Sequence, residues 1–313
     1  MTAKQLEIYL PWKILRQTQN KKHVFYRKVK EAFEEIGFTV SLIQTTPESL
    51  LLSLNSDAYL IYHRNPPQTP NALEVRPAPI GPFWAIDKTA IHSEKRIYQQ
   101  NFQPDNIKHA RAVRFFNNWA PKVIGNNTKQ YGEDDFVLVA MQGVLLRRRF
   151  WQSMPPIKMV ECIISAERER RILIKLHPRE RYSKQELDAL TRLTNDRVKI
   201  IDGDIGELLS SCAYTVSMNS SVSFKGLFYR KPGILFGDMD FHHVFQTVGH
   251  QGDVQDSVDQ VLSSAVDFEK YIFWFLYKQM INMNRDWAKS LILSRCAELG
   301  WKLGEYTPSN FRP

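Results

Sequence analysis

Residues 213–236, AYTVSMNSSVSFKGLFYRKPGILF, contain the pattern that decides the fold. An apolar strand, Ala213–Ser217, is followed by a polar turn and a helix from Ser220 to Tyr229, and the segment ends in a second apolar strand, Gly233–Phe236. Two apolar strands joined by a helix are typical of a β–α–β unit, in which the two strands run parallel. The segment therefore predicts an α/β domain with a parallel sheet.

The same alternation continues on the amino-terminal side of this segment. Strands are predicted at Phe136–Met141, Arg171–Leu176 and Val198–Ile201, with helices at Ile157–Glu167, Ser183–Asn195 and Ile205–Cys212. An earlier pattern of the same kind consists of a strand at Leu6–Leu10, a helix that ends at Gly37, and strands at Phe38–Ile43 and Asp57–Tyr62. Between Arg64 and Pro82, six prolines predict a long loop or extended chain.

A polar stretch with glycines, residues 121–135, separates the two patterns. We expect an amino-terminal Rossmann-like domain over residues 1–125 and a carboxy-terminal one over residues 135–265. Helices over residues 266–313 are expected to pack across both domains. The fold class is thus α/β, with two Rossmann-like domains whose parallel sheets face a cleft.

The composition favours an anionic partner without selecting one. Lys and Arg number 42 against 33 Asp and Glu, a formal net charge of +9. This charge suits a nucleotide sugar, an acidic glycan or an anionic membrane surface. It also suits nucleic acid, which ranks last because no known nucleic-acid-binding module appears.

Cysteine usage and apolar segments indicate the compartment. The three cysteines are dispersed, which argues against both a disulfide framework and a zinc site. Met1–Leu10 does not resemble a secretory signal, and the longest apolar stretch, Tyr271–Tyr277, is too short to span a bilayer. We therefore expect a cytoplasmic protein.

Three short segments follow predicted strands, where ligands bind in open α/β sheets. After the first strand, His177 can donate a hydrogen bond to a phosphate oxygen beside Pro178 and Arg179, although the alternative is a strand-ending turn. After the second, Asn219, Ser220 and Ser221 begin a helix, and they either bind an anion or simply cap the helix. After the third, the loop carries Gly237 and His242, which contact a ligand or lie on the surface.

In combination, these segments resemble the carboxy-terminal domain of the capsule polysaccharide biosynthesis family, which includes β-Kdo transferases. They are also similar to bacterial sialyltransferases, in which a His-Pro motif and a serine pair hold the phosphate of a CMP-sugar. The resemblance covers residues 136–243 and implies a GT-B fold, a nucleotide-sugar donor and no separate cofactor. It places His177, Ser220 and Ser221 at the donor phosphate, and Gln142 at the cleft.

The chain departs from the family at two positions. In the β-Kdo transferases an acidic residue needed for chemistry follows the glutamine, whereas here Gly143 follows Gln142, with a basic run at residues 147–149. Lys225 stands where the family usually has Glu. A glycosyltransferase that builds a capsular or surface polysaccharide is the leading hypothesis. The alternatives are a non-catalytic GT-B-like assembly or binding protein and a sugar-nucleotide epimerase or hydrolase.

The amino-terminal half offers candidates for the general base that glycosyl transfer to a glycan or lipid-linked glycan needs. These candidates are Asp87, His92 and Glu94, which packing or surface roles explain equally well. No metal is expected, since the acidic pair Asp202 and Asp204 is more typical of a turn.

An aromatic segment, Tyr271–Trp287, allows two interpretations. A helix lying on the inner membrane would give the protein a peripheral membrane contact. Because its aromatic residues are spread around the helix, we instead expect a helix buried within the fold.

Overall fold

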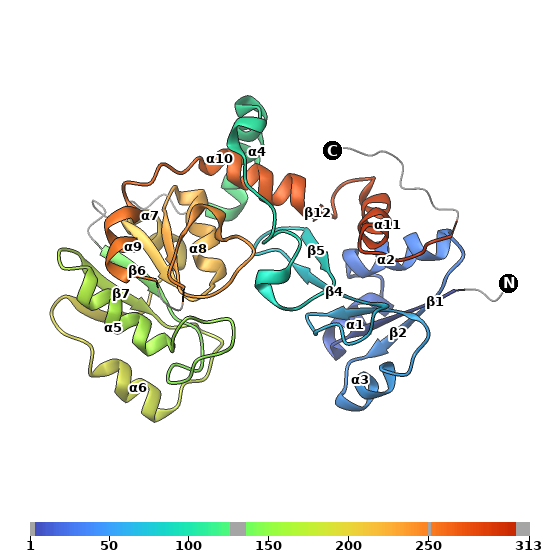
Figure 1. Ribbon diagram of the computed structural model, residues 1–313, viewed down its shortest axis with the longest axis horizontal. Helices are drawn as coiled ribbons and strands as arrows, with labels where there is room; N and C mark the ends of the chain where they lie inside the picture. Colours follow the sequence, from blue (N-terminus) through green and yellow to red (C-terminus); the bar gives the residue numbers. More distant parts are fainter. Residues whose placement is uncertain (1–3, 126–135, 250–251, 305–313) are drawn as a thin grey trace. The chain divides into compact units, whose positions relative to one another are not determined.

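The computed structural model describes residues 4–125, 136–249 and 252–304 (Figure 1). The chain divides into two compact units. Unit 1 contains the described parts of Met1–Arg96 and Phe275–Pro313, and unit 2 is formed by Ile97–Trp274. Unit 1 is therefore discontinuous in sequence, and its last segment returns to complete it.

Unit 1 contains a six-stranded sheet in the order β12-β5-β4-β3-β1-β2. Its strands are β1 (Gln5–Leu10), β2 (Thr39–Gln44), β3 (Tyr59–His63), β4 (Ala72–Pro77), β5 (Phe83–Asp87) and β12 (Ile281–Asn282). Strands β1, β2, β3 and β4 are parallel to one another, whereas β5 is antiparallel to both β4 and β12. The parallel part is thus closed on one side by an antiparallel pair.

The helices of unit 1 are α1 (Trp12–Gln19), α2 (Val24–Glu35), α3 (Pro47–Ser53) and α11 (Ala288–Glu298), with a short 3₁₀ turn, η1 (His92–Glu94). Phe25, Val29 and Phe33 recur along one face of α2 and are completely buried or nearly so. The carboxy-terminal helix α11 packs against α2 (Figure 1). Ile292 and Cys296 of α11 join the same core as Phe25 and Phe33.

Unit 2 contains a fully parallel sheet in the order β11-β10-β9-β6-β7-β8. Its strands are β6 (Phe136–Ala140), β7 (Arg171–Lys175), β8 (Val198–Ile201), β9 (Tyr214–Ser217), β10 (Gly233–Leu235) and β11 (Gln246–Thr247). The chain runs from β6 through β7 to β8, and then crosses back to β9 on the other side of β6. This is the Rossmann strand order, and its topological switch point lies between β6 and β9.

The remaining elements of unit 2 alternate with these strands and surround the sheet. They are η2 (Pro104–Asn106), α4 (His109–Ile124), α5 (Pro156–Ala166), α6 (Lys184–Thr191), α7 (Ile205–Ser211), α8 (Ser221–Gly226), η3 (Leu227–Tyr229), η4 (His242–Val244), α9 (Val254–Val261) and α10 (Phe268–Ile272). Ser183 and Glu186 form the predicted capping box at the start of α6. The predicted α/β class is confirmed in both units.

The division of the chain differs from the predicted domains. Residues 97–124 belong to unit 2, because α4 packs against α10 and η3. The predicted separating stretch, 121–135, lies partly within α4, which continues through Pro121, and otherwise outside the described residues. The expected carboxy-terminal helical region is shared, since residues up to Trp274 belong to unit 2 and Phe275 onwards to unit 1.

The long loop predicted between Arg64 and Pro82 is interrupted by a strand. Strand β4 occupies Ala72–Pro77 and pairs with β3 in parallel. A proline lies outside the strand at Pro70 and another is its last residue, Pro77. Neither proline interrupts the strand, so the local sequence can pair despite its proline content.

The aromatic segment is buried, as predicted. Helix α10 continues into a π-helical segment, η5 (Phe273–Gln279). The side chains of Trp274 and Phe275 are only 5% and 0% exposed, whereas Tyr277 and Trp287 are half-buried, so most of the aromatic surface of this segment is inside the fold. Within the described part of the chain, no helix is both long enough and apolar enough to cross a bilayer.

Candidate functional site

The carboxyl edge of the sheet in unit 2 gathers most of the predicted ligand-binding residues. Because all six strands are parallel, their carboxyl ends lie along one edge. Along that edge, the second residue beyond the ends of β10, β9, β6 and β7 is Gly237, Asn219, Gln142 and His177, respectively. The sheet thus brings together residues that are up to 95 positions apart in sequence.

Gln142 lies at the switch point, two residues after β6, which is the neighbour of β9. Its Oε1 atom is buried and has no hydrogen-bond partner among the described residues. A buried acceptor without a partner costs about 1–3 kcal/mol, so such atoms are usually satisfied by something that the protein alone does not supply. The amide oxygen is therefore available to accept a hydrogen bond from a ligand.

The serine pair divides into a cap and an exposed residue. Ser220 is 5% exposed, and its hydroxyl accepts a hydrogen bond from the backbone N–H of Val222 at 3.2 Å, which makes it the N-cap of α8. Ser221 is the first residue of the helix and is exposed. Asn219 precedes the cap and is half-buried. Ser221 and Asn219 are thus the accessible side chains at this turn.

His177 has a fixed orientation at the end of β7. Its Nδ1 accepts a hydrogen bond from the backbone N–H of Arg179 at 3.2 Å. Its own backbone N–H donates to the hydroxyl of Tyr182 at 2.9 Å. With Nδ1 acting as acceptor, the neutral ring carries its proton on Nε2. His177 therefore presents an N–H donor, while Pro178 and Arg179 are exposed beside it.

The structure does not place His177 and the serine turn on adjacent strands. Strands β7 and β9 flank β6, so their backbones are about 10 Å apart. Gln142 stands between them. That His177, Ser220 and Ser221 bind a single phosphate stays a prediction.

An acidic side chain that sequence reasoning missed lies next to Gly143. A Cβ atom built on Gly143 would collide with the carboxylate of Glu180. Glu180 follows His177 and Pro178 in the turn after β7, and β7 is the neighbour of β6. The carboxylate thus occupies the space where a side chain at position 143 would lie. This contact could have been predicted only if β6 and β7 had been known to be neighbours in the sheet.

The backbone beside this carboxylate is strained. Val144 has a φ angle of +63°, which is unusual for a β-branched residue. Such conformations cost free energy and cluster at functional sites. The turn after β6 therefore carries both an unpaired amide oxygen and a strained residue.

A small pocket lies near the ends of β10 and β11. Its volume is about 120 Å³, and its lining includes Tyr98, Trp151, Gly237, Asp238 and His242. The rings of Tyr98 and His242 pack with centroids 4.0 Å apart. Burial lowers the pKa of His242, and burial with the nearby Asp238 raises the pKa of Tyr98. The pocket therefore combines an aromatic wall with neutral polar groups and one carboxylate.

Gly237 contributes backbone rather than side-chain chemistry to this pocket. It forms an isolated antiparallel bridge with Gln152. A Cβ atom there would lie 3.0 Å from the carbonyl oxygen of Trp151 and 3.2 Å from that of Met218. The glycine is thus required by close packing of three backbone segments.

The candidate bases Asp87, His92 and Glu94 lie elsewhere. Strand β5 is antiparallel to β4, and Asp87 pairs with Glu74. The chain after Asp87 therefore runs toward the amino ends of the parallel strands of unit 1, away from the edge where ligands bind. The topology does not bring these three residues to that edge.

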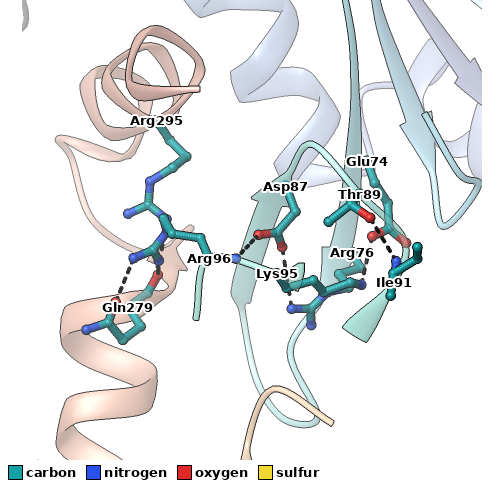
Figure 2. A network of polar contacts seen from close by, with 9 residues as sticks. All are labelled: Glu74, Arg76, Asp87, Thr89, Ile91, Lys95, Arg96, Gln279 and Arg295. Atoms are coloured by element: carbon teal, nitrogen blue, oxygen red, sulfur yellow. Dashed lines mark hydrogen bonds and ion pairs between the residues drawn. The ribbon is translucent and has the colours of Figure 1, made fainter. Parts of the chain in front are cut away.

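Asp87 belongs to a buried network of charges, shown in Figure 2. Its carboxylate lies 3.5 Å from the guanidinium of Arg76 and accepts a hydrogen bond from the backbone N–H of Arg96 at 3.2 Å. Next to this pair, Lys95 and Glu74 form an ion pair at 2.8 Å with both side chains buried. Asp87 is 2% exposed, so its position indicates a structural role.

His92 and Glu94 lie in the loop that this network holds at both ends. Glu94 is exposed and accepts a hydrogen bond from the hydroxyl of Thr89 at 3.1 Å. His92 is half-buried in η1. Among the described residues, no group of three His, Cys, Asp or Glu side chains is arranged to hold a metal ion.

Comparison with known proteins identifies the fold through solved structures. No protein-family model matches the sequence, and no curated protein matches it. The structure is similar to the Thermosulfurimonas dismutans KpsC β-Kdo 2,7 transferase, with 10% identity, a TM-score of 0.54, and coverage of 95% of this chain and 99% of that chain.

Weaker likenesses accompany this one. The β-Kdo 2,4 transferase of the same KpsC has 13% identity and a TM-score of 0.49, with coverage of 87% of this chain and 90% of that chain. A Methanocaldococcus jannaschii UDP-GlcNAc 2-epimerase has 12% identity and a TM-score of 0.41, with coverage of 95% and 100%. The predicted resemblance to β-Kdo transferases is confirmed at the level of the GT-B fold.

Proposed function

We propose that this protein is a glycosyltransferase that moves a sugar from a nucleotide-activated donor, CMP-linked by the resemblance of its motifs, to a capsular or surface polysaccharide. The observation that carries the proposal is the buried, unpaired Oε1 of Gln142. It lies at the switch point of a Rossmann-ordered sheet, where such folds bind nucleotides. A donor hydroxyl or amino group would satisfy this atom.

The order of the polar groups along the edge suits an extended nucleotide sugar. The pocket near β10 and β11 suits the base, with Tyr98 and His242 as its aromatic wall. Asn219 and Ser221 follow at β9, Gln142 at β6 and His177 at β7. From β10 to β7 the edge spans about 14 Å, which is three strand spacings. One extended ligand can therefore reach all four groups.

Transfer requires stabilisation of the departing phosphate and a base for the acceptor hydroxyl. Donors from His177, Asn219 and Ser221 serve the phosphate in this proposal. The carboxylate of Glu180, packed over Gly143, is the base or charge-stabilising group. It supplies an acidic side chain at the turn after Gln142, where the sequence itself has glycine. This arrangement favours an enzyme over a non-catalytic binding protein.

The fold neighbour supports sugar transfer. Its name describes a β-Kdo transferase, and its likeness covers nearly the whole of both chains. The positive net charge of the chain suits both a nucleotide sugar and an acidic glycan. A glycan acceptor is thus part of the proposal.

Nucleotide titration into the full chain tests the donor site. Wild-type protein is expected to bind one of CMP, UDP, GDP or dTDP, measured by calorimetry and by the rise in melting temperature. Gln142→Ala removes one buried hydrogen bond, so we expect affinity for that nucleotide or its sugar conjugate to fall about tenfold. Gln185→Ala, at an exposed position on α6, is the matched control and should bind as the wild type does.

Two results would contradict the donor site. One is the absence of binding of every nucleotide and nucleotide sugar by the wild type. The other is an equal affinity for the nucleotide in Gln142→Ala and Gln185→Ala, which would show that Gln142 does not contact the ligand.

A further inference from the structure

A second group of polar side chains lies at the carboxyl edge of the sheet in unit 1. The chain runs from β1 to β2 on one side and returns to β3 on the other, so the switch point of this sheet lies between β1 and β3. His63 is the last residue of β3. His23 is the N-cap of α2, the helix that leads into β2, so the amino end of α2 also faces this edge.

Tyr26 fixes the tautomer of His63. The hydroxyl of Tyr26 lies 2.6 Å from Nδ1 of His63, and the tyrosine is 0% exposed. Among the described residues, His63 is the only hydrogen-bond partner of that hydroxyl. A buried phenol proton needs an acceptor, so the hydroxyl donates to Nδ1 and the ring proton lies on Nε2.

His23 has the same tautomer for a similar reason. Its Nδ1 accepts a long hydrogen bond, 3.5 Å, from the backbone N–H of Tyr26. Its ring packs near Tyr26 and near the edge of Trp84, with centroids 4.8 and 5.6 Å apart. The ring of His63 also faces Trp84, at 6.1 Å. Both imidazoles therefore present an Nε2–H donor from the same cluster.

The two imidazoles are neutral at pH 7. Burial lowers the pKa of both rings, and for His63 burial together with the charge of Arg64 lowers the pKa to about 4. His63 is 9% exposed, and its Nε2–H has no hydrogen-bond acceptor within the described part of the chain. The His63 side chain is therefore nine-tenths buried, and its Nε2–H is left to donate to a ligand.

The surroundings of the cluster are cationic. Arg64 is exposed, forms no ion pair among the described residues, and acts electrostatically on both His63 and Tyr26. Lys21 and Lys22 are exposed immediately before His23. The first N–H groups of α2, a helix of 12 residues, add partial positive charge at the same end.

From this geometry we infer that His23, His63 and Arg64 form an oxyanion-binding site, and that it holds a carboxylate or phosphate of the sugar acceptor. Two neutral N–H donors and a guanidinium match the acceptor oxygens of such a group. The inference rests on the proposed function, because it takes the ligand of this site to be the acceptor of a sugar transfer whose donor binds to unit 2. It narrows the acceptor to an acidic glycan.

Titration of small sugars into the full chain tests this site. The probes are methyl β-D-glucuronoside for a carboxylate, glucose 6-phosphate for a phosphate, and methyl β-D-glucoside as the neutral match. The readout is the nitrogen NMR signals of the His23 and His63 rings. We expect the glucuronoside, the phosphate or both to shift these signals, and the glucoside to leave them unchanged.

Variants separate recognition from folding. Arg64→Asn keeps a residue that tolerates the positive φ of +54° and should weaken binding of the anionic probe about tenfold or more. His63→Leu should weaken it about ten- to a hundredfold, with a melting curve recorded to check folding. Arg168→Gln removes a charge at an exposed position of unit 2 and should have no effect.

The outcomes distinguish this inference from the proposed function. Binding of CMP or UDP in unit 2 should be unchanged by Arg64→Asn. Nucleotide binding with no response to either anion, or with equal anion affinity in the wild type and Arg64→Asn, overturns the oxyanion site alone. Anion binding that depends on Arg64, in a protein that binds no nucleotide, supports the site and contradicts the proposed donor function.

Discussion

At the scale of single residues, ring tautomers are determined by what bonds to Nδ1. In His177 the partner is a backbone N–H two residues along the chain, whereas in His63 it is a tyrosine hydroxyl 37 residues away. Both rings consequently present Nε2–H as a donor. The His177 arrangement follows from the local sequence, because a ring after a strand end can accept from the turn that follows it. The His63 arrangement could not be predicted, since no motif connects the two residues.

The acidic residue at the donor edge illustrates the same limit. By its resemblance to β-Kdo transferases, the sequence has Gly143 where those proteins have an acid, but it does not show which segment fills that space. Glu180 reaches it from the turn that follows the adjacent strand, β7. Predicting this contact requires both the strand order and the path of the turn after His177.

Substitution of this carboxylate gives a prediction at the residue scale. Glu180→Gln keeps the size of the side chain and removes its charge. We expect turnover of the nucleotide sugar to fall about 10²- to 10⁴-fold, because a general base or a stabilising charge is lost. Nucleotide affinity should change by less than about threefold, because the carboxylate acts in the transfer step and not in binding of the nucleotide.

The control for this prediction is Glu169→Gln, an exposed carboxylate on the same unit. Its turnover should equal that of the wild type. Full activity in Glu180→Gln would show that another group deprotonates the acceptor.

At the scale of elements, the strands of unit 2 could be predicted and some of those in unit 1 could not. β6 (FVLVA) is continuously apolar and the middle of β7 (RILIK) is apolar too, as expected of strands within a parallel sheet. In unit 1, β4 carries buried Glu74 and Arg76, and β5 ends in buried Asp87. Charged residues in a strand suggest exposure, so their pairing with each other was not apparent from the sequence.

The buried pairs of β4 and β5 also explain why Asp87 was a misleading candidate base. An acid beside aromatic residues is expected in an active site, but here it balances Arg76 and holds the backbone of Arg96 (Figure 2). In Figure 2 the guanidinium of Arg96 points instead to Gln279, where it donates to the side-chain and backbone oxygens, each at 2.7 Å. The network thus joins β5 to the returning carboxy-terminal segment within unit 1.

Removal of one charge from this network gives a prediction at the element scale. Lys95→Met leaves Glu74 buried without its ammonium partner at 2.8 Å. We expect the free energy of unfolding to fall by about 3–5 kcal/mol, measured by urea denaturation. The double variant Lys95→Met, Glu74→Met removes both charges and should recover most of that loss.

Lys158→Met is the matched exposed control. Its ammonium pairs with Glu161 at 3.0 Å, with both side chains largely in solvent, so the unfolding curve should be the same as that of the wild type. Similar losses in Lys95→Met and Lys158→Met would contradict the assigned role of the buried pair.

At the scale of the whole molecule, the chain folds into units that the linear sequence does not delimit. The alternation of strands and helices indicates two Rossmann-like sheets, and the structure has both. The polar stretch at 121–135 suggested the boundary, yet the division falls at Arg96 and again at Trp274. The place where the chain passes from one unit to the other depends on which core each helix packs into. Helices α4 and α11 pack against elements that are distant from them in sequence.

This discontinuity predicts which parts of the chain unfold together. The core of unit 1 includes Ile8 and Phe33 together with Ile292 and Trp301, so the amino-terminal and carboxy-terminal segments should share one opening reaction. Ile292→Ala removes a completely buried side chain from α11 and should cost about 2–5 kcal/mol. Ile163→Ala does the same in α5 of unit 2 and is the matched variant.

In native-state hydrogen exchange, Ile292→Ala should lower the protection of amides in β1 and β2 as well as in α11, while the amides of β6 and β7 keep their protection. Ile163→Ala should produce the reverse pattern. Equal loss of protection in β1 and β6 in both variants would mean that the two units open as one, and protection lost from α11 alone would mean that it is not part of the core of unit 1.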